Sequence, residues 1–316
     1  MRISASAPGK LMLFGEHAVL HGYPCLVTTV GLRYKVSIVP IDEPIIFIHT
    51  PALENKKEDY SVTIEDLPRT QLNNEDTKFI LAVLKELMPS GGYRNGFKIT
   101  TDGPVSSYGL GSSSAICSAT VRALSKVLGT DLSKEEIFQK AYTAVLKVQG
   151  TGSGFDTAAA TFGGTLRYQT GMDIRKLPIK ELPLVIGFTG KKASTVDLVN
   201  KVDQQTHDEL FQSIGEITES AETALIKEDW ETLGILANKN QELLEALGVS
   251  TPTLEKGIAA ARQAGAYGAK LSGAGGGDCM FAICGPSKIG LLEKELENAG
   301  LQVLKFETNI QGVRFE

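Results

Sequence analysis

The chain has 316 residues, of which 42% are hydrophobic and 22% are charged, and its formal net charge is −5 at pH 7. This length predicts two lobes, and the weak negative charge gives no general attraction to nucleic acid or to an anionic membrane. No apolar run approaches the roughly 20 residues of a membrane span, and a glycine motif at Pro8 leaves no room for a signal peptide. We therefore expect a cytoplasmic protein without nucleic-acid or membrane partners.

The cysteines fit this expectation. They have no metal-like spacing and stand in apolar stretches, which predicts buried, reduced thiols. They are Cys25, Cys117, Cys279 and Cys284.

The first half of the chain is predicted to form strands and then helices. Apolar and polar side chains alternate over Leu32–Val39, as in a half-exposed strand. Shorter strands are expected at Ile45–His49 and Phe97–Thr100. Ser133 is followed three residues later by Glu136, which is a capping-box signature at a helix start. The expected helices are Asn74–Met88, Ser112–Val127 and Ser133–Val148.

The second half is predicted to be mainly helical before it returns to strands. A buried strand is expected at Leu182–Phe188, and the amphipathic period predicts helices at Glu209–Ile226 and Trp230–Leu247. Thr251 and Pro252 open a further helix. The closing elements are expected at Cys279–Cys284, Ile289–Asn298, Leu301–Thr308 and Gly312–Phe315, of which the second is a helix. This order predicts an α+β fold with domains at 1–181 and 182–316.

Three glycine motifs, far apart in the chain, have the composition expected of one phosphate site. Glycine permits a positive φ and lets backbone N–H groups approach an anion closely. A lysine, a glutamate and several hydroxyls stand beside these glycines, so the motifs together predict a bound nucleotide. The first motif is Pro8–Lys10 running into Gly15–His17, the second is Gly109–Ser114 and the third is Ser272–Asp278.

The second glycine motif is the most specific of the three. It leads directly into the predicted helix at Ser112–Val127, so its N–H groups would lie at the positive end of that helix. A serine hydroxyl at this place is also a suitable oxygen ligand for Mg²⁺. The alternative is a glycine turn with Ser112 as an ordinary N-cap. The chain has no P-loop, no dinucleotide fingerprint and no protein-kinase signature.

An isolated acid, Asp156, stands among small and apolar residues in Gly152–Ala160. A carboxylate there needs a partner, because burying an unpaired charge is costly, and Lys10 is the candidate. Such a pair could accept or polarise the proton of a substrate hydroxyl, as kinase chemistry requires. The alternative is an aspartate that caps a helix.

Together these motifs resemble the GHMP kinases, the superfamily that includes mevalonate kinase and phosphomevalonate kinase. They occur near the start, middle and end of the chain in the order of that family, and Ala7–Gly22 resembles the mevalonate kinase opening over its whole length. The resemblance implies a two-lobed α+β fold with ATP between the lobes, and it allows a homodimer. The N-terminal lobe would contain a left-handed βαβ unit like that of ribosomal S5 domain 2, and the C-terminal lobe would be helix-rich and ferredoxin-like.

The resemblance also implies roles in the ATP- and Mg²⁺-dependent phosphorylation of the C5 hydroxyl of mevalonate. Asp156 would be the base, Lys10 would lower the pKa of the hydroxyl, and Ser113 would be the Mg²⁺ ligand. The phosphates would be wrapped by Ser107, Tyr108, Gly109, Leu110, Gly111, Ser112 and Ser113. The acceptor would lie beside Glu16, His17, Ser194, Thr195, Gly275 and Gly276.

Departures from the family pattern leave the acceptor open. Val145 stands where mevalonate kinases carry a glutamate as a second Mg²⁺ ligand. The segments Gly152–Asp156 and Gly275–Cys279 resemble phosphomevalonate kinase more closely, whereas chain length and His17 favour mevalonate kinase. Phosphomevalonate is therefore the alternative acceptor. A non-catalytic, ligand-responsive binding protein is the alternative outside the enzymes, because a fold does not by itself assign a function.

Overall fold

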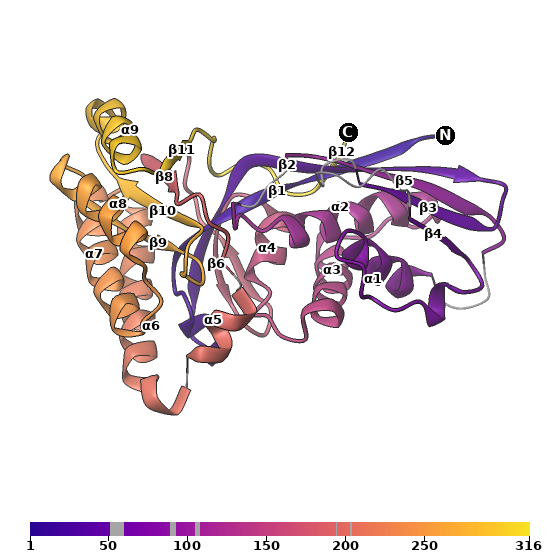
Figure 1. The fold of residues 1–316 in the computed structure, drawn as a ribbon, viewed down its shortest axis with the longest axis horizontal. Helices are drawn as coiled ribbons and strands as arrows, with labels where there is room; N and C mark the ends of the chain where they lie inside the picture. Colours follow the sequence, from indigo (N-terminus) through magenta and orange to yellow (C-terminus); the bar gives the residue numbers. More distant parts are fainter. Residues whose placement is uncertain (51–59, 89–92, 105–107, 194, 203) are drawn as a thin grey trace.

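A computed structural model places residues 1–50, 60–88, 93–104, 108–193, 195–202 and 204–316 of the chain. Two separate sheets divide these residues into two lobes, in agreement with the prediction from length (Figure 1). The larger sheet belongs to the first lobe and the smaller one to the second.

The sheet of the first lobe has eight strands in the order β12-β1-β2-β5-β3-β4, and β6 and β7 continue from β2. Strands β3 and β5 pair in parallel, and the connection between them contains α1 and also strand β4, which pairs with β3. The alternating burial within β2 confirms the half-exposed strand predicted at Leu32–Val39. The strands are β1 (Ile3–Phe14), β2 (Cys25–Ile41), β3 (Ile45–His49), β4 (Tyr60–Thr63), β5 (Gly96–Asp102), β6 (Thr165–Gln169), β7 (Asp173–Lys176) and β12 (Arg314–Phe315).

Four helices cover one face of this sheet (Figure 1). Helix α2 begins at Ser112, as predicted, and the capping box at Ser133 is present at the start of α3. Helix α1 begins at Lys78 rather than at Asn74, and the Asn74 side chain accepts the N–H groups of Asp76 and Thr77 in the turn that precedes the helix. The helices are α1 (Lys78–Leu87), α2 (Ser112–Val127), α3 (Lys134–Gln149) and α4 (Phe155–Phe162), with a short 3₁₀ helix η2 (Leu67–Arg69) before them.

The second lobe has a four-stranded antiparallel sheet in the order β11-β8-β10-β9. In chain order this is fourth-first-third-second, the ferredoxin-like arrangement. Its strands are β8 (Leu184–Phe188), β9 (Gly268–Ser272), β10 (Cys279–Ile283) and β11 (Gln302–Leu304). Its helices are α5 (Thr195–Lys201), α6 (Gln204–Ile226), α7 (Trp230–Ala246), α8 (Pro252–Gln263), α9 (Ile289–Asn298) and the 3₁₀ helix η3 (Pro286–Lys288).

The end of the chain returns from the second lobe to the first. Strand β11 ends at Leu304, so the strand predicted over Leu301–Thr308 is shorter than expected. Beyond it, Thr308 bridges Val30 and β12 pairs with β1, which brings the two termini side by side (Figure 1). The boundary between domains 1–181 and 182–316 stays a prediction, and the last residues contribute to the first sheet.

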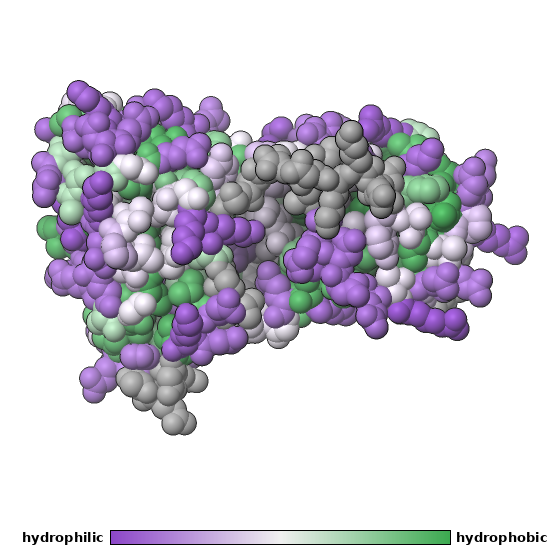
Figure 2. All heavy atoms as spheres, in the orientation of Figure 1, coloured by the Kyte–Doolittle hydropathy of each residue, from purple (hydrophilic) through white to green (hydrophobic). Residues whose placement is uncertain are grey.

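Hydrophilic residues cover most of the face of both lobes seen in Figure 2. Among the residues placed in the structure, no helix has both the length and the apolar character needed to cross a bilayer. All four cysteines are buried and free, as predicted.

Candidate active site

The first glycine motif begins inside a strand, since Pro8–Lys10 lie in β1, whereas Gly15, with a φ of 92°, follows the end of that strand. Gly9 is inside β1, where a Cβ atom would come within 2.8 Å of the carbonyl oxygen of Leu110. The N–H of Lys10 donates to that same oxygen at 2.8 Å. Gly9 is therefore required for close approach of two backbones, and it fixes Lys10 beside the second glycine motif.

The second glycine motif forms a tight turn at the start of α2. Gly109 and Gly111 have φ values of 72° and 80°, in the left-handed region that glycine tolerates. Gly111 is the N-cap of α2, and no side chain caps the helix. The N–H groups of the first turn, at Ser112 and Ser113, therefore face a site at the positive end of the helix, which suits an anion such as a phosphate.

Asp156 lies in the first turn of α4 and pairs with Lys10. The distance from Lys10 Nζ to Asp156 Oδ1 is 3.0 Å, which confirms the predicted pair. The side chain of Lys10 is 9% exposed and that of Asp156 is 36% exposed, so solvent reaches the acid. A Cβ atom on Gly111 would lie 3.6 Å from Asp156 Oδ1, which puts the pair directly beside the second glycine motif.

Hydroxyl contacts between α2 and α4 hold the acid in this place. Thr157 Oγ1 donates to Ser114 Oγ at 3.2 Å, and the hydroxyls of Ser118 and Thr161 lie 3.1 Å apart one turn further on. These buried contacts couple the helix that carries Asp156 to the helix that begins at the glycine turn. The sequence predicted the acid but not helix α4.

The charge of Lys10 is maintained by acids on both sides. Burial lowers the pKa of Lys10, but the charge and hydrogen bond of Asp156 and the charge of Asp278 outweigh burial, and the pKa is raised. Lys10 is therefore a cation throughout the neutral range. A permanent positive charge next to a partly exposed carboxylate can balance negative charge that develops on a bound reactant.

The third glycine motif closes the site from the second lobe. A carbonyl oxygen only accepts, so His17 donates from Nε2 to Ala274 O at 3.0 Å, and Ser272 Oγ donates to Met12 O at 2.8 Å. Gly275 and Gly276 have φ values of 85° and 70° and complete the turn. Burial lowers the pKa of His17, so the imidazole is neutral at pH 7.

Glu16, which the family resemblance placed beside the acceptor, is enclosed in the protein. Its side chain and that of Lys270 both have 0% exposure, and the two form an ion pair between the lobes. The ammonium of Lys270 also lies 5.7 Å and 5.4 Å from the ring centroids of Phe14 and Phe281. The sequence analysis missed Lys270, although a single lysine in an otherwise apolar strand signals a buried anionic partner.

Two of the remaining predicted residues, Tyr108 and Thr195, belong to the described part of the chain. Tyr108 is half-buried, and its ring meets the ring of Phe188 edge-on at 5.0 Å, which joins the second glycine motif to the second lobe. Thr195 begins α5. Ser107 and Ser194 lie outside the described residues, so their predicted roles stay predictions.

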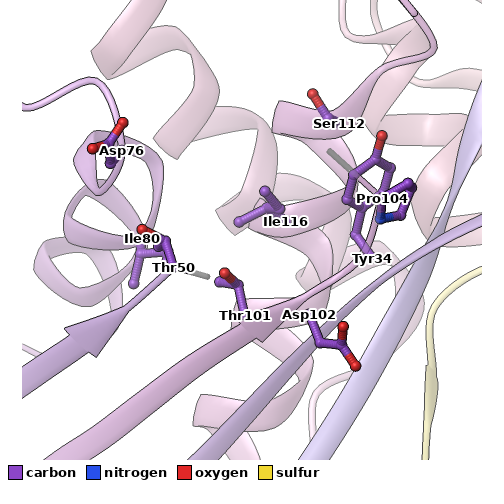
Figure 3. A pocket seen from close by; sticks show the side chains of 10 residues that line it. Tyr34, Thr50, Asp76, Ile80, Thr101, Asp102, Pro104, Ser112 and Ile116 are labelled. Carbon is purple, nitrogen blue, oxygen red and sulfur yellow. The ribbon is translucent and has the colours of Figure 1, made fainter. Parts of the chain in front are cut away.

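A pocket opens beside the start of α2 (Figure 3). Ser112 and Pro104 lie on one side of it, Asp76 and Thr50 lie on the other, and Ile116 lies between them (Figure 3). Because Ser112 belongs to both the pocket and the second glycine motif, one ligand could occupy both.

The residues around Ser113 partly fit a magnesium ion. A serine hydroxyl at the uncapped helix start is a hard oxygen ligand of the kind Mg²⁺ prefers. Val145 is a buried core residue of α3, and the described part of the chain contains no cluster of three or more acidic, histidine or cysteine side chains suited to a metal. The protein can thus contribute few ligands, and a nucleotide and water would complete the coordination.

Known families match both lobes. Residues 78–164 match the model of the GHMP kinases N terminal domain, and residues 221–301 match GHMP kinases C terminal. The mevalonate kinase of Pyrococcus furiosus is 35% identical over 100% of this chain and 99% of its own length.

Solved structures of these kinases are also similar to this chain. A mevalonate kinase from L. major, in complex with R-mevalonate, is 29% identical with a TM-score of 0.77, over 97% of this chain and 96% of the other. A phosphomevalonate kinase from Streptococcus pneumoniae has a TM-score of 0.79 over 98% of this chain and 99% of the other, but at 21% identity this likeness shows the fold alone.

Proposed function

Because this chain belongs to the GHMP kinases, in the mevalonate kinase family, we propose that it transfers the γ-phosphoryl group of ATP to the C5 hydroxyl of mevalonate. The observation that carries the proposal is the Lys10–Asp156 pair, which lies within contact distance of the second glycine motif. A carboxylate that is paired with a lysine and lies beside a phosphate-binding turn is the arrangement that phosphoryl transfer to an alcohol requires.

The second glycine motif would bind the phosphates of ATP. Its left-handed glycines and the uncapped N–H groups of α2 point to an anion, and the helix dipole favours negative charge there. The pocket that shares Ser112 would then take the adenosine. Ser113 would hold Mg²⁺, which supplies neutralisation of phosphate charge when bound.

Asp156 would accept or orient the proton of the attacking hydroxyl. Its partial exposure leaves room for an acceptor, and the ion pair with Lys10 at 3.0 Å holds the carboxylate beside the second glycine motif. Lys10 would also stabilise the oxyanion that develops as the proton leaves. Most of the rate enhancement would come from positioning the hydroxyl in line with the phosphoryl group.

The acceptor would lie where the lobes meet, between the first and third glycine motifs. Neutral His17 donates to Ala274, so its other ring nitrogen is an acceptor that can receive a hydrogen bond from a substrate hydroxyl. Lys191 or Lys192, in the loop after β8, would face the anionic end of the acceptor. Glu16 would act on this region through structure, because it is fully buried against Lys270.

An acceptor assay tests the proposal. ADP release would be measured with ATP and Mg²⁺ and either mevalonate or 5-phosphomevalonate, side by side. We expect turnover with mevalonate and none with 5-phosphomevalonate. The reverse result would establish the alternative acceptor, and ATP binding without turnover on any acceptor would establish the non-catalytic alternative.

A further inference from the structure

Asp278, the last residue of the third glycine motif, contributes a charge near Lys10, but its own contacts have no role in the mechanism above. The residue is 8% exposed, and its φ of 55° is left-handed although it carries a Cβ atom. Such a backbone conformation is unfavourable and persists where the surrounding structure holds it. The contacts of Asp278 show what holds it.

On one side, Asp278 is bonded three times to the loop Thr189–Ala193, which we name the acceptor loop. Its backbone N–H donates to Lys191 O at 2.8 Å, and its carbonyl oxygen accepts from Thr189 N at 2.9 Å. Its side chain reaches further along the same loop, where Oδ1 accepts from Ala193 N at 3.0 Å. The side-chain bond is therefore the one that fixes the far end of the loop.

On the other side, the carboxylate lies against the second glycine motif. A Cβ atom on Gly109 would come within 2.3 Å of both Cγ and Oδ2 of Asp278, so only glycine at that position permits the contact. The thiol of the next residue, Cys279, donates to Tyr108 O at 3.2 Å. The end of the third glycine motif thus bridges the acceptor loop and the phosphate-binding turn.

Two lysines surround the same carboxylate. Burial raises the pKa of Asp278, and the N–H of Ala193 and the charges of Lys10 and Lys192 oppose that rise. One of these lysines belongs to the reacting pair and the other to the acceptor loop. The carboxylate therefore feels the charges of the catalytic lysine and of a lysine of the acceptor loop.

We propose that Asp278 is a positioning residue that fixes the acceptor loop against the second glycine motif through its hydrogen bond to the N–H of Ala193. The loop would then hold the acceptor hydroxyl in front of the Lys10–Asp156 pair. This inference rests on the proposed function, since it takes the loop to border the acceptor. The phosphate-binding turn is also held by the bond from Lys10 N to Leu110 O, so loss of Asp278 acts on the acceptor side.

Two substitutions of Asp278 distinguish its hydrogen bond to Ala193 from a merely structural role. Asp278→Ala removes the acceptor oxygen and should raise KM for mevalonate about tenfold, the usual effect of losing a charge-assisted hydrogen bond, with KM for ATP within about twofold of wild type. Asp278→Asn keeps Oδ1 and should restore KM for mevalonate to within about threefold. If the alanine variant does not fold, Asp278→Gly takes its place, because glycine tolerates the observed φ.

Asp229→Ala is the matched control. Asp229 Oδ1 also accepts a backbone N–H, that of Thr232 at 3.1 Å, but at the start of α7. Its removal should leave both KM values unchanged. Equal rises of both KM values in Asp278→Ala, no rise in KM for mevalonate, or an asparagine variant as impaired as the alanine variant would each overturn the proposal.

Hydrogen–deuterium exchange tests the tether without any turnover. The amide of Ala193 should exchange faster in Asp278→Ala than in wild type or Asp278→Asn, and unchanged exchange would refute the tether. If the wild type phosphorylates no acceptor but exchange behaves as expected, the proposed function fails and the tether stands. If the wild type phosphorylates mevalonate but the amide of Ala193 exchanges no faster in Asp278→Ala, the tether fails and the proposed function stands.

Discussion

Two lysine–carboxylate pairs in this protein have the same chemistry and opposite surroundings. In the pair at the site, Asp156 is 36% exposed and faces the second glycine motif, whereas Lys270 and Glu16 are both 0% exposed and join the two lobes. The first glycine motif contributes one partner to each pair, Lys10 to the former and Glu16 to the latter. Two residues of one motif therefore have different roles, one at the candidate site and the other at the contact between the lobes.

The difference lies in what surrounds each carboxylate. Water and an incoming reactant can reach Asp156, so its charge remains available for chemistry and contributes little to stability. Glu16 has no access to water, and burial raises its pKa while the charge of Lys270 opposes that rise. A charge buried in this way depends on its partner, so breaking the Glu16–Lys270 pair, which we call the inner pair, should strongly destabilise the protein.

Asp156→Asn should give the largest effect on rate and almost none on stability. We expect kcat to fall by roughly 10²–10⁴-fold, the usual contribution of a general base, with ATP binding retained. Because the pair is partly exposed, the free energy of unfolding should change by less than about 1 kcal/mol. Steady-state kinetics and urea unfolding of the same preparation measure both quantities.

Lys10→Met and the double variant control this experiment. If the two residues act as a unit, the double variant should be little slower than either single variant. An Asp156→Asn enzyme with nearly normal kcat would exclude Asp156 from the proton-transfer step, and additive losses would show that the residues act separately.

Breaking the inner pair should give the opposite result. Lys270→Met leaves Glu16 buried without a counter-charge and should lower the free energy of unfolding by about 3–5 kcal/mol. Adding Glu16→Gln should recover much of that loss, because the second substitution removes the unpaired charge. Chemical denaturation of the two single variants and the double variant measures the coupling.

Lys305→Met is the control on the surface. Lys305 is 69% exposed and pairs with Glu293 at 2.7 Å, so its loss should cost less than about 1 kcal/mol. If Lys270→Met costs no more than Lys305→Met, burial does not distinguish the two classes of pair and the comparison fails.

Ser113→Ala tests whether Ser113 is a Mg²⁺ ligand at the candidate active site. Val145 is apolar and buried, so Ser113 is the hydroxyl on which Mg²⁺ would depend. We expect the Mg²⁺ concentration for half-maximal rate to rise about tenfold, equivalent to about 1.4 kcal/mol, with no change in stability beyond about 0.5 kcal/mol. A magnesium titration of kcat measures the shift. An unchanged midpoint would remove Ser113 from the metal site.

Local patterns predicted the parts of this fold whose causes are local. The capping box at Ser133 and the start of α2 at Ser112 follow from side chains within a few residues of each helix end. The pairing of Lys10 with Asp156 was also predictable, because an isolated acid among apolar residues requires a partner.

Contacts over long sequence distances were not predictable in the same way. The reason for the glycine at position 9 is a carbonyl at Leu110, about a hundred residues away, and this contact was not predicted. Glu16 was expected beside the acceptor, but its partner Lys270 comes from the second lobe. Neither partner has a spacing that a sequence pattern can express, so the tertiary structure decides these roles.

His17 offers the finest test of the contact between the lobes, and its expected effect is the smallest. Burial lowers its pKa below the ordinary value of 6.5, although its bond to Ala274 opposes this. The unfolded state therefore binds the proton more readily than the folded state. The neutral imidazole of His17 therefore contributes stability that is fully present above about pH 6.5 and is lost as the pH falls through the pKa of His17 in the folded state.

His17→Gln keeps an N–H for Ala274 and removes the titration, so it isolates the effect of His17 from that of every other group. Between pH 8 and pH 5, the free energy of unfolding of wild type should fall by more than that of His17→Gln. Parallel curves for the two proteins would mean that His17 is as easily protonated in the folded state as in the unfolded one. The contact between the first and third glycine motifs would then be open to water. Glu16, the residue before His17, would in that case not be enclosed, and the Glu16–Lys270 pair would no longer differ from the Lys10–Asp156 pair in its surroundings.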